Sequence, residues 1–130
     1  DSSKRIKAAK AWSIWEGSTV KLIQNKALIE HSSDSRFAEA FSRIECHYFT
    51  NNGWFDTDNY LIENIDKIRH IPTVIVHGRY DVVCPVENAW ELHKAWPESD
   101  LHIIPDSGHA MSEEGIKDKL IEYTDKFSKL

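Results

Sequence analysis

The stretch that decides the fold is Thr-Val-Ile-Val-His-Gly-Arg-Tyr-Asp, residues 73–81. Its β-branched apolar run, Thr73–His77, ends at Gly78 and is typical of a short strand that is buried on both faces. Leu101–Ile104 is a second short run of this kind. A helix is predicted after each strand, so the order of elements is β, α, β, α. This order implies an α/β fold in which two parallel strands are joined by a right-handed crossover.

Proline residues mark the helix between the two strands, and apolar spacing marks the helix after them. Pro85 can occupy the first turn of a helix, and Pro97 ends it. The last helix is predicted from apolar residues that share one face, namely Ile116, Leu120, Tyr123 and Phe127.

Three further helices are predicted before residue 70. The first covers residues 4–16 and stops at Gly17. The second covers residues 34–49, begins at Ser33 or Asp34 as cap, and carries an apolar stripe of Phe37, Phe41, Ile44 and Tyr48. The third begins at Asp58 and ends before Pro72.

The chain therefore divides near residue 70 into a helical portion, 1–70, and one βαβα unit, 71–130. Two parallel strands need cover on both faces and both edges. We therefore expect this unit to be incomplete and to depend on further polypeptide for stable folding.

Composition excludes several classes of partner. The 130 residues are 41% hydrophobic and 28% charged, which is the balance of one folded domain or a piece of one. The net charge is −5 and no basic stripe is present, so we expect no nucleic acid. No apolar stretch reaches the ~20 residues that span a bilayer, so we expect no membrane partner and a cytoplasmic protein.

The cysteines and three of the histidines show no metal-binding pattern. Cys46 and Cys84 are too few for a disulfide scaffold, and we expect reduced thiols. His47, His70 and His77 lack ligand spacing and are assigned structural roles. We expect neither a metal nor a cofactor.

Asp81 and His109 follow the two predicted strands, and the carboxyl ends of parallel strands meet at one edge of a sheet. A carboxylate bonded to the imidazole Nδ1–H holds the tautomer that acts as a general base in nucleophilic hydrolases. The order Asp then His matches the last two members of an α/β-hydrolase triad. No G-x-S-x-G elbow is present, since Ser18 lacks the second glycine and Ser107 lies in a loop. The nucleophile is therefore expected outside these residues.

Several longer motifs resemble one family of α/β-hydrolases. Residues 43–49 (Arg-Ile-Glu-Cys-His-Tyr-Phe), 68–85, 89–97 and the pair Gly108-His109 resemble the C-terminal part of the proline iminopeptidases, which remove an N-terminal proline from peptides. The resemblance implies that 1–70 is a segment of the helical cap and that 71–130 is the C-terminal βαβα part of the α/β-hydrolase core. It also implies a peptide substrate with an N-terminal proline, and an absent N-terminal portion that carries the serine.

The resemblance assigns roles to four side chains. It makes Asp81 the triad acid and His109 the base, and it makes Glu16 and Glu45 the cap residues that hold the free amine of the substrate. Physical chemistry supports a cation-binding role for the two glutamates. A negative charge near a helix C-terminus, as at Glu16, favours a nearby cation, and so does a desolvated carboxylate beside an apolar stripe, as at Glu45.

Four other residues have weaker assignments. Trp12, Trp15 and Trp54 belong either to the wall of a proline pocket or to the core. Cys84 resembles a family cysteine near the site, although a packed thiol is the simpler interpretation. The loop after His109, residues 110–114, departs in part from the family pattern, which leaves open any contact made by that loop.

Two other function classes stay open on the sequence. One is another α/β-hydrolase, such as an esterase or epoxide hydrolase. The other is a non-enzymatic α/β binding module in which Asp81 and His109 are incidental turn residues. A separation above ~5 Å between the two side chains would favour the binding module. If the protein is a hydrolase of either kind, this chain lacks the nucleophile and is expected to be inactive alone.

Overall fold

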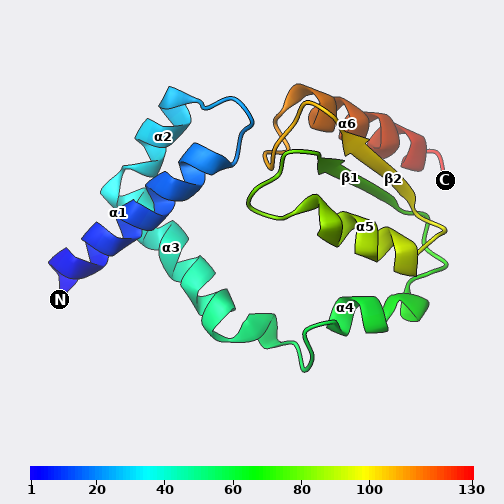
Figure 1. Ribbon diagram of the computed structural model, residues 1–130, viewed down its shortest axis with the longest axis horizontal. Helices are drawn as coiled ribbons and strands as arrows, with labels where there is room; N and C mark the ends of the chain where they lie inside the picture. Colours follow the sequence, from blue (N-terminus) through cyan, green and yellow to red (C-terminus); the bar gives the residue numbers. More distant parts are fainter. The chain divides into compact units, whose positions relative to one another are not determined.

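The computed structural model describes residues 1–130, which form two compact units. The first unit contains Asp1–Thr19 and Ile23–Asp58, and the second contains Val20–Leu22 and Asn59–Leu130. Figure 1 labels the helices and strands of both units. None of the helices combines the length and the apolar character needed to cross a membrane.

The first unit is helical. Its elements are α1 (Ser2–Thr19), α2 (Lys26–Ser32), α3 (Ser35–Thr50) and the 3-10 turn η1 (Asn52–Trp54). Helix α1 packs against both α2 and α3 (Figure 1). The α1 and α3 helices confirm two predictions, whereas α2 was not predicted, although Asn25 caps it by accepting a hydrogen bond from the Leu28 N–H at 3.1 Å.

Small residues make the contact between α1 and α3. The buried residues of α1 are Ala9, Ser13 and Gly17, and those of α3 are Ala38 and Ser42. The predicted apolar stripe of α3 does not form this contact, because three of its four members, Phe37, Ile44 and Tyr48, are exposed.

Gly17 has a different role from the predicted one. Helix α1 continues past it to Thr19, and Gly17 is buried against α2. A Cβ atom at this position would lie 2.3 Å from the Ser32 Oγ atom. Gly17 is therefore a point of close helix approach rather than a helix stop.

Asp34 begins α3, as the sequence predicts. Its Oδ1 atom accepts a hydrogen bond from the Phe37 N–H at 2.8 Å. This bond is the main reason why the pKa of the Asp34 carboxyl lies below its ordinary value of 3.8. The cap satisfies one of the backbone donors that every helix start leaves without a partner.

The interface between α1 and α3 predicts different effects for two matched substitutions. Ser42 Oγ donates to the Ala9 carbonyl at 3.0 Å, whereas the buried Ser13 Oγ has no hydrogen-bond partner. Ser→Ala gains the same small helix propensity at both sites. We expect Ser13→Ala to raise the free energy of unfolding and Ser42→Ala to lower it relative to Ser13→Ala by about 1 kcal/mol. Urea unfolding of protein expressed from the complete coding sequence measures both, and equal effects would contradict this packing.

The second unit contains the sheet. Strand β1 (Val74–Gly78) pairs in parallel with β2 (Asp100–Ile104), and Gly78 lies opposite Ile104 in the register. Helix α5 (Val86–Ala95) connects the strands and α6 (Glu114–Phe127) follows β2. Figure 1 shows α5 on one side of the two strands and α6 on the other. The predicted order β, α, β, α is confirmed.

Two predictions for this unit are corrected. Strand β1 is half-buried over Val74–His77, not buried on both faces, because it has one hydrogen-bonded neighbour strand. The single helix predicted from Asp58 is two short pieces, α4 (Tyr60–Glu63) and the 3-10 turn η2 (Ile65–Lys67). Asn64 separates them, and its side-chain amide donates to the Tyr60 carbonyl at 2.7 Å. A side chain that bonds nearby backbone in this way competes with helix continuation.

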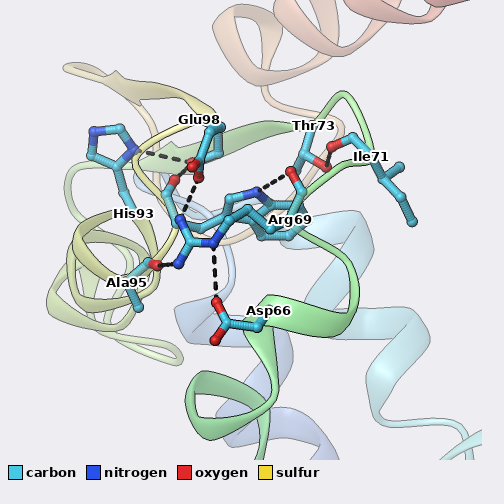
Figure 2. A network of polar contacts seen from close by, with 9 residues as sticks. Asp66, Arg69, Ile71, Thr73, His93, Ala95 and Glu98 are labelled. Carbon is cyan, nitrogen blue, oxygen red and sulfur yellow. Dashed lines mark hydrogen bonds and ion pairs between the residues drawn. The ribbon is translucent and has the colours of Figure 1, made fainter.

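Arg69 ties the segment before β1 to the end of α5. Its guanidinium reaches Asp66 at 3.1 Å, Glu98 at 2.6 Å and the Ala95 carbonyl at 2.9 Å (Figure 2). The indole N–H of the buried Trp96 in turn donates to the Arg69 carbonyl at 3.4 Å. This network fixes how the chain enters β1.

Candidate active site

The two loops that leave the carboxyl ends of β1 and β2 lie in direct backbone contact. The Arg79 N–H donates to the Ile104 carbonyl at 2.9 Å, and the Tyr80 N–H donates to the Ser107 carbonyl at 3.0 Å. A Cβ atom on Gly78 would lie 1.9 Å from the Gly108 carbonyl oxygen. Because Gly78 has no side chain, the loop that carries His109 can lie against the end of β1.

Asp81 is buried in the first of these loops, with its side chain 4% exposed. Its Oδ1 atom accepts hydrogen bonds from the Val83 N–H at 2.9 Å and the Cys84 N–H at 2.8 Å. These bonds close a tight turn after the aspartate and orient its carboxylate. The second oxygen, Oδ2, is thereby directed to the His109 ring.

His109 Nδ1 lies 2.9 Å from Asp81 Oδ2. A carboxylate oxygen can only accept, so Nδ1 carries the proton, and Nε2 of the neutral ring holds a lone pair. The His109 side chain is 36% exposed, whereas that of Asp81 is nearly covered. The structure therefore brings together the two side chains that the sequence places at the ends of neighbouring strands, in the tautomer that a general base requires.

His77, for which the sequence predicts a structural role, is a neighbour of this pair. Its Nε2 atom lies 2.9 Å from the Cys84 carbonyl and 3.5 Å from Asp81 Oδ2. The carbonyl accepts, so Nε2 carries the proton of the neutral ring. The position of His77 near the end of β1, four residues before Asp81, was the signal that could have placed it beside the site.

Glu16 and Glu45 both belong to the first unit, Glu16 on α1 and Glu45 on α3. Glu45, on α3, accepts a hydrogen bond at its Oε2 atom from the Trp12 indole N–H at 2.5 Å. Trp12 and Glu16 are one helical turn apart on α1, so their side chains share a face of that helix. Both glutamates are partly exposed. The Trp12 bond therefore brings Glu45 to the face of α1 that carries Glu16.

The chain matches a known protein family over most of its length. The sequence pattern of the alpha/beta hydrolase fold matches residues 9–116. The chain belongs to the α/β-hydrolase family. Two solved structures share its fold, an esterase from Exiguobacterium antarcticum and a serine hydrolase involved in carbazole degradation. Their TM-scores are 0.62 and 0.55 at 22% and 21% identity, and the match covers 99% and 100% of this chain but 47% and 48% of theirs.

More similar sequences are named proline iminopeptidases. A protein from Leptolyngbya boryana, named a probable proline iminopeptidase, is 58% identical over 98% of this chain and 40% of its own length. The proline iminopeptidase from Xanthomonas citri is 49% identical over 98% of this chain and 41% of its own length. The proline iminopeptidase from Arabidopsis thaliana is 50% identical over 95% of this chain and 32% of its own length. This α/β-hydrolase chain thus spans about 40% of the length of the first two relatives.

Three tryptophans and one cysteine of this α/β-hydrolase chain, all with the weaker assignments, are exposed. Trp12, Trp15 and Trp54 are 38%, 52% and 56% exposed, so the core alternative for them is wrong. The Trp12 ring centroid lies 5.7 Å from that of Trp15 and 6.3 Å from that of Phe49. Cys84 is exposed, so the prediction of a packed thiol is wrong, and its backbone N–H and carbonyl contact Asp81 and His77.

The histidines and cysteines do not assemble into a metal site. No group of three or more His, Cys, Asp or Glu side chains has the arrangement that could hold a metal ion. Neither Cys46 nor Cys84 is in a disulfide.

The contact between Gly78 and the His109 loop yields a stability prediction. In Gly78→Ala, the new methyl group meets backbone oxygens that cannot move without opening the site, so we expect a loss of ~1–3 kcal/mol in the free energy of unfolding. Gly115→Ala is the comparison, because its methyl would meet side chains and no backbone, with the Ile104 side chain nearest at 2.6 Å, and alanine gains helix propensity there. Urea unfolding of the two variants, each expressed from the complete coding sequence, measures the difference, and a larger cost for Gly115→Ala would contradict the assigned contact.

Proposed function

We propose that this chain is the C-terminal portion of a serine exopeptidase that releases N-terminal proline from peptides. The carrying observation is the 2.9 Å contact between His109 Nδ1 and the buried Asp81 carboxylate. The relatives named proline iminopeptidase support the substrate class. In this proposal residues 1–70 belong to the helical cap, and residues 71–130 form the C-terminal βαβα part of the core.

The nucleophile comes from a preceding part of the protein. Ser107 is 1% exposed, and Ser18 Oγ donates to the Ile14 carbonyl at 2.6 Å within α1, so neither serine is presented on an open strand-to-helix turn. His109 Nε2 accepts the proton of the upstream serine as that serine attacks the carbonyl of the first residue. His109 then donates this proton to the leaving amine, and water releases the acyl-enzyme.

Asp81 supports both proton transfers. Its Oδ2 atom holds the Nδ1–H of His109 and stabilises the imidazolium that forms when Nε2 takes a proton. The two N–H groups of Val83 and Cys84 compensate the negative charge of the buried carboxylate at Oδ1. The nearly covered carboxylate therefore has hydrogen-bond partners at both of its oxygens.

Glu16 and Glu45 position the free amine of the N-terminal proline in this proposal. The Trp12 N–H occupies Oε2 of Glu45 and leaves the other carboxylate oxygen for an ammonium. An ammonium ~4 Å from a carboxylate gains ~1 kcal/mol in water and ~4 kcal/mol at an effective dielectric constant of 20. Two such carboxylates would favour a substrate with a free N-terminus over one whose amine is blocked.

The chain alone is inactive in this proposal, because its triad lacks the serine, and the preceding portion of the same protein is its required partner. The chemistry needs neither a metal nor a cofactor. The binding-module alternative predicts a separation above ~5 Å between Asp81 and His109, and the observed 2.9 Å does not meet that criterion.

The proposal is tested with protein expressed from the complete coding sequence that contains these residues. We expect hydrolysis of a prolyl amide, slower hydrolysis of the alanyl amide, and little hydrolysis of the N-acetylprolyl amide. Asp81→Asn should lower kcat by roughly 10⁴-fold because it loses the required tautomer. Glu45→Gln should raise KM for the prolyl amide.

Asp106→Asn is the matched control for Asp81→Asn. Asp106 is an exposed acid in the loop that carries His109, so its loss should leave kcat unchanged. Hydrolysis of simple esters without preference for a free prolyl amine would indicate an esterase instead. No hydrolysis of any of these substrates would favour the binding module.

A further inference from the structure

The backbone of His109 is fastened to a segment far away in the sequence. The N–H groups of His109 and Ala110 both donate to the Val20 carbonyl, at 3.0 and 2.7 Å. Val20–Leu22 follows α1 along the chain but belongs to the second unit. The approach is close, since a Cβ atom on Gly108 would lie 3.0 Å from the Leu22 nitrogen. The loop of the proposed base is therefore held by the Val20–Leu22 segment as well as by its contact with Asp81.

Glu113 connects the same two segments through its side chain. Its Oε1 atom accepts from the Gly108 N–H at 2.7 Å, and its Oε2 atom accepts from the Leu22 N–H at 3.2 Å. Glu113 occupies the N-cap position of α6, yet its side chain forms no cap bond with that helix. A cap side chain ordinarily accepts from the first turn of its own helix. Here the carboxylate is instead committed to the loop before His109.

The chemistry of this bridge requires a carboxylate. Two backbone N–H groups from different segments meet one side chain, so both of its oxygens must accept. An ionised carboxylate has two acceptor oxygens and no donor, and its charge strengthens both bonds. A glutamine has one acceptor oxygen and an NH₂ group that would face a backbone donor.

We propose that Glu113 is a positioning residue for His109, holding the Gly108–His109 backbone against Val20–Leu22. The inference rests on the proposed function, since it assigns His109 the role of general base. Asp81 fixes the ring of His109 at Nδ1, and Glu113 fixes the backbone from which the ring projects. Because the ring and the backbone of His109 are both held, Nε2 is kept in one position relative to the serine hydroxyl.

Glu113→Gln tests the inference in protein expressed from the complete coding sequence. We expect kcat for the prolyl amide to fall roughly ten- to a hundredfold, because a small displacement of a catalytic group is costly. KM should stay within about twofold, because Glu113 is not assigned to substrate binding. Amide hydrogen exchange at His109 and Ala110 should become faster.

Two controls separate positioning from other effects. Glu114→Gln removes the same charge from the neighbouring exposed residue and should leave kcat unchanged. Arg69→Gln weakens the polar network of Figure 2 and should lower the unfolding temperature without changing kcat of the folded protein. If Glu113→Gln does not fold, Glu113→Asp keeps the charge but is too short to reach both N–H groups, and we expect the same loss of kcat.

The outcomes distinguish this inference from the proposed function. A folded Glu113→Gln variant with wild-type kcat and wild-type amide exchange overturns the positioning role, as does an equal loss of kcat in Glu114→Gln. If the wild type hydrolyses esters and not prolyl amides, the substrate proposal fails. The positioning role is then tested by comparing kcat of the wild type and Glu113→Gln with the ester as substrate. A wild type that hydrolyses neither substrate overturns both.

Discussion

The close approach of two backbones at the carboxyl edge of the sheet is the constraint on which the site depends. Gly78 lies opposite Ile104 at the end of the parallel register and leaves room for the Gly108 carbonyl. Backbone hydrogen bonds then join the two loops, and the buried Asp81 meets the His109 ring at 2.9 Å. A side chain at residue 78 would separate these loops. The glycine is thus as much a part of the site as the two polar side chains that it allows to meet.

A second consequence of packing concerns the first unit. Its helices approach through Ala9, Ser13, Ala38 and Ser42, so the large aromatic side chains are left outside the contact. Trp12 and Phe49 are among these, and Trp12 donates to Glu45. Because small residues fill the helix interface, the aromatic side chains lie outside it, where the Trp12 indole N–H and apolar surface lie beside the Glu45 carboxylate. In the proposed function, that surrounding would receive the secondary amine of an N-terminal proline, whose nitrogen lies within an apolar ring.

The sequence predicts most of the second unit because its signals are local. The run at residues 73–78, the prolines around α5 and the helical spacing of α6 each lie within a few residues, and parallel strands bring Asp81 and His109 to one edge. Long-range contacts leave no such pattern. The burial of Gly17 against Ser32 and the reach of Glu113 to Leu22 join distant segments, so neither could be derived from spacing. The β-branched run likewise indicates a strand but not how many neighbours cover it.

The most direct test of the account is nitrogen-15 NMR of the His109 side chain in the complete protein, with Asp81→Asn as the comparison. We predict that neutral His109 carries its proton on Nδ1. In Asp81→Asn the Val83 and Cys84 N–H groups need the amide oxygen at the Oδ1 position, so the NH₂ group faces Nδ1 and moves the proton to Nε2. A neutral His109 that carries its proton on Nε2, or one whose signals are unchanged in Asp81→Asn, would contradict the contact between the two side chains.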